Sequence, residues 1–477
     1  MPRQLPADCL NEIFEHLEKD KATLHSCLLV NRLWCEVTVR ILWRNIWIIN
    51  PVDYVDYSRR LKVGTSILNT LIACLPNKSK THLLEKGILN STHISKTPLF
   101  NYASFCKVLS IHMIGQMIID VFKNQKYLAK EIMKMFMETV SLKKLSYYTS
   151  SKTINLSFLR YPGAKGCLTN LSKLSCNSNV KSAFFYKLSQ ICCNIQSLTI
   201  EFNGTISSDL KNLISSQNNL KHLSLSRTRT HSTADWADII PSLAKHSNSL
   251  IRLKVHWRKY NYWNKTEQLS FITTFTNLQE LILSFHHKDC FAGLNSKLLD
   301  ITFPQLQILK FLYEYPEDYV LSKFLENNGK NLKEFYINCS NTISAIAEFC
   351  PNLKFLSTLF RFDKIDSLKT VLNNCQQLES IDTQYYYGLL SEKELLGTLA
   401  KYSPKNFHKL KVRYYSYSQL VPEDLEEFFI NWENRVSQRS ISLVFRGCMN
   451  SFGAKEENMG IIKKYRELGI IKKFELK

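Results

Sequence analysis

Cations that alternate with apolar residues mark two short stretches of this chain. In a β-strand successive side chains point to opposite faces, so each set of cations is expected on one face, opposite its apolar neighbours. Guanidinium and ammonium groups gathered in this way bind carboxylates and phosphates. The stretches are "LIRLKVHWR" and "HKLKVRYY", and their basic residues are Arg252, Lys254, His256 and Arg258, then Lys409, Lys411 and Arg413.

Aromatic residues crowd the segment that follows the first stretch. Within "HWRKYNYWNK" at 256–265 they are Trp257, Tyr260, Tyr262 and Trp263, and smaller clusters occur at 312–319, 359–362, 384–388 and 413–418. Tyr, Trp and Arg are the residues enriched in binding hot spots. These aromatic residues, together with both sets of cations, are therefore the predicted target-binding residues. The alternative is that the aromatic rings pack between neighbouring loops and complete the core.

Motifs for catalysis or metal binding were sought and not found. The sequence contains no G-x-x-x-x-G-K-S/T, H-E-x-x-H, G-x-S-x-G or C-x-x-C motif. His286, His287, Asp289 and Cys290 could in principle hold a metal, but one loop supplies too few convergent ligands, and a solvated polar loop is the better interpretation. We therefore expect a non-catalytic protein without a metal or cofactor.

The overall composition predicts a folded, basic protein. The 477 residues are 45% hydrophobic and 12% aromatic, which excludes a disordered chain. Lys and Arg outnumber Asp and Glu by 62 to 41, and the resulting charge of +21 favours anionic partners. Nucleic acid is one such partner, but no RNA-binding, zinc-finger or helix-turn-helix signature supports it.

The cysteines and the hydropathy pattern predict a cytoplasmic or nuclear protein. The 14 cysteines are dilute and lie inside apolar patterns, which favours free thiols in a reducing compartment. Three that stand just before expected strands, Cys193, Cys350 and Cys375, are predicted to be buried thiols. The most apolar stretch, 108–122, is too short to span a bilayer and is interrupted by polar residues.

Three short amphipathic helices are predicted in the first fifty residues. The first carries Leu10, Ile13, Phe14 and Leu17 on one face, the second follows a capping Asp20, and the third begins near Asn31. A unit of this size buries little by itself, so its apolar faces must be covered by the rest of the chain or by another protein.

The segments "LPADCLNEIFEHL", "LHSCLLVNRLWCEV" and "ILWRNIW" together resemble an F-box, over positions 4–48. Asp8 departs from the family, which more often has Glu there. The resemblance implies docking on the Skp adaptor of Skp–cullin–F-box ubiquitin ligases. The residues that it marks as adaptor contacts, or as supports of that interface, are Leu5, Pro6, Ile13, Phe14, Leu17, Leu28, Val30 and Trp34. The alternative is that the three helices cap the array described next.

A repeated pattern occupies most of the remaining chain. Eleven copies, from "SLKKLSY" at 141 to "NFHKLKV" at 406, follow one another at spacings of 21 to 30 residues, and "FCKVLSI" at 105 and "IIKKFEL" at 470 are degenerate outer copies. Helical segments precede many copies. The spacing is typical of leucine-rich repeats, and the units resemble those of divergent fungal F-box/leucine-rich-repeat proteins. The Asn that usually follows the strand is mostly absent, so an irregular horseshoe is expected.

These observations predict an α/β protein with an F-box-like unit at 1–48, a helical linker or cap at 49–100, and a leucine-rich-repeat-like solenoid at 101–477. The predicted function is a substrate receptor of a Skp–cullin–F-box ubiquitin ligase, with an acidic or phosphorylated protein as target. Two alternatives remain. One is a repeat scaffold without a ligase role, and the other is a basic repeat protein that binds nucleic acid or phospholipid.

Overall fold

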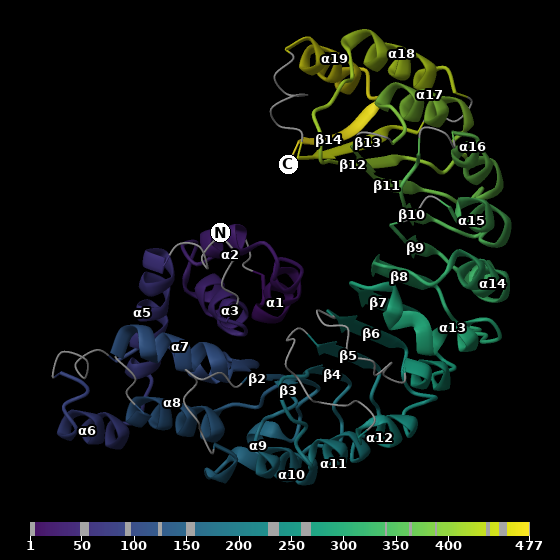
Figure 1. Cartoon of the computed structure of the whole chain (residues 1–477). Coiled ribbons are helices and arrows are strands. Elements are labelled where there is room, and N and C mark those ends of the chain that lie inside the picture. Colours follow the sequence, from purple (N-terminus) through teal and green to yellow (C-terminus); the bar gives the residue numbers. More distant parts are fainter. Residues whose placement is uncertain are drawn as a thin grey trace. The chain divides into compact units, whose positions relative to one another are not determined.

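A computed structural model gives the structure of the chain (Figure 1). It describes residues 5–47, 57–90, 97–122, 126–148, 158–227, 238–258, 269–338, 341–361, 365–386, 389–435, 439–447 and 456–476. The chain divides into two compact units, and the division falls between Lys221 and His222, inside the predicted repeat array.

The first unit opens with helices and continues with four strands. Parallel pairs join β1 to β2, β2 to β3 and β3 to β4, so the strands follow chain order. Its elements are α1 (Ala7–Glu15), α2 (Lys21–Cys27), α3 (Arg32–Trp43), α5 (Tyr57–Ala73), α6 (Asn77–Glu85), η2 (Tyr102–Phe105), β1 (Val108–Ser110), α7 (Ile111–Phe122), α8 (Lys126–Thr139), β2 (Lys144–Tyr147), η3 (Phe158–Arg160), α9 (Ala164–Leu168), β3 (Lys173–Asn177), α10 (Ser182–Ile191), β4 (Ser197–Glu201) and α11 (Leu210–Ser215).

The second unit alternates strands with helices throughout. Its elements are β5 (His222–Arg227), α12 (Ile240–Ala244), β6 (Arg252–Trp257), η5 (Leu269–Thr274), β7 (Glu280–Phe285), η6 (Lys288–Phe291), α13 (Ala292–Leu298), β8 (Ile308–Tyr313), α14 (Asp318–Asn328), η7 (Gly329–Asn331), β9 (Glu334–Tyr336), α15 (Ile343–Phe349), β10 (Phe355–Ser357), α16 (Ile365–Asn374), β11 (Ser380–Tyr385), α17 (Glu392–Tyr402), β12 (Lys409–Tyr414), α18 (Pro422–Glu433), β13 (Ile441–Arg446), α19 (Glu456–Glu467) and β14 (Ile471–Leu476).

The second unit has two layers. Its strands pair in parallel with their neighbours in chain order, and helices α13 to α19 lie along one side of the strands (Figure 1). Residues such as Leu253, Leu281 and Leu309 share one register position and are fully buried beneath the helices. The opposite strand face carries the alternating polar residues. The predicted α/β repeat architecture is confirmed at this level.

The repeat pattern located the strands with one omission. Each of the eleven copies and both degenerate copies contains a strand that begins one to three residues after the copy starts. The strand β13 was missed. Its register with β12 aligns Ser440 with the buried Phe407, so the leading apolar residue of the pattern is absent there. The apolar residues within β13 are nevertheless buried, which explains why it still joins the sheet.

The cysteine prediction needs one correction. Cys350 and Cys375 are buried free thiols as expected, but Cys193 is exposed and the buried thiol is its neighbour Cys192. The register explains the difference, because Cys192, Cys350 and Cys375 all stand two residues before their copies, whereas Cys193 stands one residue before. At this position the Cys192 thiol donates to the Leu171 carbonyl at 3.3 Å.

Two further properties concern the described residues as a whole. All of their cysteines are free. None of their helices combines the length and the apolar character that crossing a membrane requires.

Candidate functional site

The three N-terminal helices form a small core of their own. Leu10 and Phe14 from α1, Leu24 and Cys27 from α2, and Val37 and Ile41 from α3 are buried together. The Phe14 and Trp34 rings meet edge to face with centroids 5.1 Å apart. Asp20 caps α2 as predicted, because it accepts the Thr23 amide at 3.1 Å. Asn31, near which the third helix was expected to begin, caps α3 by accepting the Trp34 amide at 2.9 Å.

Several apolar side chains of this unit remain in solvent although its core is complete. On α1 and just before it, Leu5 is 50% exposed and Ile13 is 47% exposed, and Pro6 is also exposed. In the turn between α2 and α3, Leu29 is 88% exposed and Val30 is 55% exposed. Exposed apolar residues on both segments make this unit a candidate interaction surface.

The predicted adaptor-binding residues therefore fall into two groups. Leu5, Pro6, Ile13 and Val30 are available for contact. Phe14 is buried in the core, and the half-buried Leu17 and Trp34 pack against that core. Leu28 is also half-buried. Leu29, the most exposed of the apolar residues, was not selected, although it lies between two residues that were.

Leu28 borders an open groove of about 680 Å³. Three helices line it with residues spaced by four and three positions, which are Lys21, His25 and Leu28 from α2, Cys35, Val39 and Leu42 from α3, and Val63, Ile67 and Thr70 from α5. The groove shows that α5 continues the helical unit beyond the predicted F-box boundary.

Arg44 joins the helical unit to the first strand. Its guanidinium donates two hydrogen bonds to the Glu15 carboxylate, at 2.7 and 2.5 Å, and these bonds lower the pKa of Glu15. Its carbonyl accepts the Lys107 and Val108 amides at 2.9 and 3.2 Å. Trp47 also donates its indole N–H to the Val108 carbonyl at 2.6 Å.

The same bond pattern recurs between repeats. The Lys107 carbonyl accepts the Lys143 and Lys144 amides, and the Lys143 carbonyl accepts those of Ser172 and Lys173. The Arg44 carbonyl therefore bonds to the start of β1 in the same way that the Lys107 and Lys143 carbonyls bond to the starts of the strands that follow them. The three-helix unit therefore meets the array through the same bond pattern by which each repeat meets the next, which is how a cap would join it.

The cations predicted on β6 lie on the polar strand face, but most of them have partners. Arg252 pairs with Glu280 of β7, and His256 shares a hydrogen bond of 2.7 Å with the Ser284 hydroxyl. Burial lowers the pKa of His256, and charge repulsion from His286, Lys254 and Arg258 lowers it further. The imidazole is therefore neutral near pH 7. Lys254 and Arg258 are exposed.

Trp257 corrects the prediction of a surface aromatic at this strand. It is only 6% exposed, because it alternates with His256 and shares the buried side with Leu253 and Val255. The Arg227 guanidinium lies 5.7 Å from its ring centroid. Tyr260, Tyr262 and Trp263 lie outside the described residues, so the predicted contact through them stays a prediction.

The second set of predicted cations centres on one carboxylate. Lys411 and Arg413 of β12 both pair with Asp382 of β11, the latter at 3.1 Å, and Asp382 is almost completely buried. Lys409 is exposed at the end of the same strand. Two cations therefore share one carboxylate, so this part of the face keeps one net positive charge and is bordered by the exposed Lys409.

An aromatic platform on the same face was not predicted. Tyr336 of β9 stacks on Phe355 of β10 with centroids 4.6 Å apart, and the Lys310 ammonium lies 3.9 Å from the Tyr336 ring centroid. Aligning the repeat copies would have indicated that these side chains share one face, because Lys310, Tyr336 and Asp382 occupy the same position of their copies.

The aromatic loops are partly core and partly surface. Tyr385 and Tyr414, the last residues of their strands, are buried, whereas the following Tyr386 and Tyr415 are exposed. Tyr417, Tyr319 and Tyr313 are exposed as well. Both interpretations of the aromatic clusters therefore apply, because some of these aromatic residues complete the core and others are exposed. The exposed tyrosines lie near the carboxyl ends of strands β8, β11 and β12.

No group of three metal-ligating side chains converges anywhere in the described residues. In the 286–290 loop, His287 lies 3.1 Å from Asp289, and Cys290 is buried.

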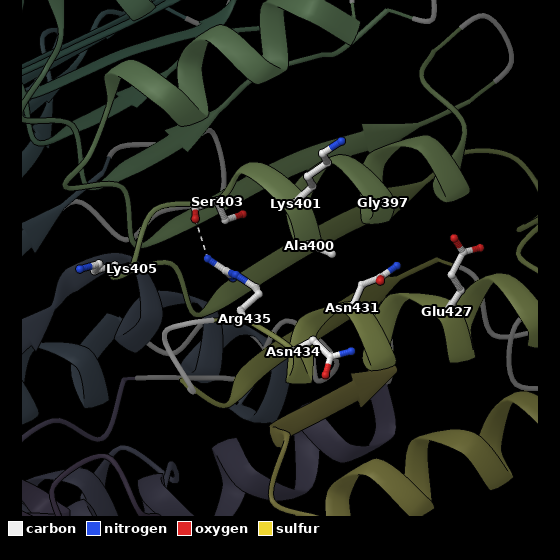
Figure 2. Close-up of a pocket in the computed structure, with 9 residues that line it drawn as sticks. All are labelled: Gly397, Ala400, Lys401, Ser403, Lys405, Glu427, Asn431, Asn434 and Arg435. Atoms are coloured by element: carbon white, nitrogen blue, oxygen red, sulfur yellow. Dashed lines mark hydrogen bonds between the residues drawn. The ribbon is translucent and has the colours of Figure 1, made fainter.

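A polar cleft between α17 and α18 was also missed (Figure 2). It measures about 620 Å³ and lies on the helical side of the second unit. Sequence patterns gave no indication of it, because several of its residues lie just beyond the ends of the two helices, and these are Ser403, Lys405, Asn434 and Arg435.

No family model matches this chain, and no curated protein matches it at a significant level.

Proposed function

We propose that this protein is a substrate receptor of a Skp–cullin–F-box ubiquitin ligase. Residues 5–47 would dock on the Skp adaptor, and the polar strand face of the array would hold a target protein. Ubiquitin transfer would take place on other subunits, so this chain would contribute proximity and orientation. It would act in the cytoplasm or the nucleus.

One observation carries the proposal. The three-helix unit has a completed core, yet it keeps Leu5, Ile13, Leu29 and Val30 in solvent. Burying such side chains against a partner contributes about 25 cal/mol for each Å² of apolar surface removed from water. These positions also fall within the sequence that resembles an F-box.

The target surface combines the exposed lysines with the tyrosines. Lys254 and Lys409 are exposed on the strand side, and Tyr386, Tyr415 and Tyr417 are exposed close to the carboxyl ends of β11 and β12. A surface that offers both exposed lysines and exposed tyrosines suits a protein segment that carries acidic or phosphorylated residues. The ion pairs of Arg252 and Asp382 give this surface a fixed framework.

Adaptor co-purification tests the proposal. Leu29→Asp should reduce capture of the Skp adaptor by about tenfold or more, because it places a charge in an apolar contact. Leu468→Asp is the matched control, since Leu468 is also an exposed leucine in a turn but lies near the end of the second unit. Equal capture by both variants and the wild type would contradict the docking assignment.

The cap interpretation is a second candidate with its own observation. Arg44 and Trp47 bond directly to β1, so the helices stabilise the array whether or not they bind an adaptor. Deleting residues 1–48 would therefore remove both roles at once. The substitution at Leu29 is more informative because its side chain contributes nothing to the core.

A further inference from the structure

The cleft between α17 and α18 has the composition of a binding site for a small polar anion. Small residues, Gly397 and Ala400, form its α17 side and leave the hollow. Polar side chains supply most of the remaining lining, and these are Lys401, Ser403, Lys405, Glu427, Asn431, Asn434 and Arg435. Such a lining offers little to an apolar ligand, whereas it matches charged and hydroxylated groups.

Arg435 is the innermost cation of the cleft. One of its terminal nitrogens donates to the Ser403 carbonyl at 2.5 Å and to the Pro404 carbonyl at 3.3 Å. The guanidinium lies 4.1 Å from the Trp432 ring centroid, so its plane is held in place. Figure 2 shows the side chain crossing from the end of α18 to the end of α17.

The charge of Arg435 is not compensated by a carboxylate among the described residues. Arg44, Arg252 and Arg413 each pair with an acid, whereas Arg435 bonds only to carbonyls. Partial burial lowers the pKa of Arg435. An anion that reached the guanidinium would replace the hydration that burial has removed.

The balance of charge in the cleft remains positive. Lys401, Lys405 and Arg435 exceed Glu427 by two formal charges. The carbonyl ends of the two helices oppose this with about half an elementary charge each. In Figure 2 the two lysines lie at the edges of the cleft and Arg435 lies inside it.

Hydroxyl-binding groups lie beside these cations. Asn431 and Asn434 extend from α18, and each amide offers two donors and an acceptor. We propose that the cleft binds the phosphate monoester of a small sugar or polyol, with Arg435 holding the phosphate and with the two amides and Glu427 bonding the hydroxyls.

This site is independent of the proposed ligase function. It lies on the helical side of the array, away from the strand face assigned to the target, and it uses none of the residues assigned to the adaptor. A volume of about 620 Å³ exceeds what a bare phosphate fills, so the carrier should contribute to affinity.

Calorimetric titration of the full chain tests the proposal. Glucose 6-phosphate, ribose 5-phosphate and glycerol 3-phosphate are the probes, and inorganic phosphate, sulfate and glucose are the comparisons. At least one sugar or polyol phosphate should bind about tenfold more tightly than inorganic phosphate or sulfate, which is about 1.4 kcal/mol. Binding that is equal for all anions, or absent, would overturn the proposal.

Gly397→Leu provides a variant that fills the cleft while keeping the fold. A Cβ at Gly397 meets no atom within 4 Å, and leucine is the better helix former. The variant should lose sugar-phosphate binding without a lower melting temperature. Gly460→Leu is the matched control on α19, where a Cβ also meets nothing within 4 Å, and it should bind normally.

Arg435→Lys tests the role of the planar fork, because it keeps the positive charge and loses the two-bond geometry. Affinity for the best probe should fall about tenfold in this variant. Lys463→Gln, an exposed lysine of α19, should have no effect. If Gly397→Leu and Arg435→Lys both bind as the wild type does, the cleft is not the site.

Discussion

A single buried carboxylate, that of Glu392, organises the loop that carries two of the exposed tyrosines. It accepts the Tyr414 and Ser418 hydroxyls at 2.7 and 2.6 Å on one oxygen, and the Gln419 and Leu420 amides at 2.7 and 3.0 Å on the other. The loop between β12 and α18 is therefore tied to the first turn of α17. Tyr415 and Tyr417 project from this tied loop.

Glu392→Gln should consequently destabilise the second unit. An amide has only one acceptor oxygen, so either the hydroxyls or the backbone amides would face its NH₂ group. We expect a loss of about 1.5–3 kcal/mol in the free energy of unfolding, measured by urea denaturation. Glu467→Gln, at an exposed position of α19, should change stability little. A Glu392→Gln protein as stable as the control would contradict this account of the loop.

The interaction between Glu15 and Arg44 should make the stability of the first unit depend on pH. Hydrogen bonds from Arg44 lower the pKa of Glu15 below its ordinary value of 4.5. A carboxylate whose pKa is lowered by folding stabilises the folded state above its unfolded pKa, and this contribution disappears as the pH falls through the folded pKa. The wild type should therefore melt higher than Glu15→Gln at neutral pH. Their melting temperatures should converge when the pH falls well below 4.5.

The control for this comparison is Glu12→Gln, because Glu12 is exposed on the same helix. Its melting temperature should follow that of the wild type at every pH. A gap between the wild type and Glu15→Gln that stays constant down to strongly acidic pH would show that the carboxylate charge is not what stabilises the junction.

The buried thiols give a third prediction at the scale of single residues. Burial raises the pKa of Cys375 and of Cys176 to about 12, so neither forms a reactive thiolate near neutral pH. A reducing agent should leave the melting temperature unchanged, because the described cysteines are free. In the folded protein, thiol reagents should label exposed Cys9 and Cys193 first. Early labelling of Cys375 would contradict the described packing.

At the scale of the elements, Gly329 limits how closely successive repeats pack. A Cβ on Gly329 would lie 2.6 Å from the Phe349 carbonyl oxygen and 2.9 Å from the Cys350 sulfur. The atoms in the way belong largely to the backbone of the next repeat, so displacing them would cost conformational energy. Gly329→Ala should therefore cost about 1–3 kcal/mol in the free energy of unfolding.

Gly397→Ala is the matched control for Gly329→Ala. The Cβ of Gly397 meets open space, so alanine there should raise stability by about 0.5–1 kcal/mol through its higher helix propensity. Thermal and urea unfolding of the two variants should move in opposite directions. A Gly329→Ala protein as stable as the wild type would show that the repeats can separate at this point.

Strand positions could be predicted because each repeat contains the whole apolar pattern of its strand within a few consecutive residues. "NLQELIL" at 277 and "QLQILKF" at 305 both give a strand at the same place in the copy. The pattern failed at β13, where Ser440 replaces the leading apolar residue. It also failed to give the partners of the cations, although Arg252 and Glu280 occupy the same position of copies that begin at 249 and 277. Aligning the copies would have indicated that pair.

The features that the sequence could not indicate depend on contacts without a periodic signal. Glu392 bonds to a loop more than twenty residues away, and Arg435 reaches a carbonyl of the preceding helix. The exposed apolar residues of the first helices are a different case, since the amphipathic pattern placed Ile13 on the same helix face as Phe14 and could not separate the contact residue from the core residue.

At the scale of the whole chain, the N-terminal helices have two candidate roles, which are capping the array and docking an adaptor. If they only cap the array, their importance resides in Arg44 and Trp47, which bond to β1. If they also dock an adaptor, the exposed Leu29 and Ile13 matter independently of stability. The two roles therefore depend on different residues of the same short segment, and can be separated by measuring unfolding and adaptor capture on the same proteins.

Trp47→Phe and Leu29→Asp should give opposite results in these two measurements. Trp47→Phe removes the indole hydrogen bond to the Val108 carbonyl in a buried setting, so it should destabilise the first unit by about 1–3 kcal/mol and spare adaptor capture by the folded fraction. Leu29→Asp should leave unfolding nearly unchanged and abolish capture, since its side chain lies almost wholly in solvent. Loss of capture in Trp47→Phe at temperatures where it is fully folded would mean that docking extends to the junction with the array. Full capture by Leu29→Asp would leave the helices with the capping role alone.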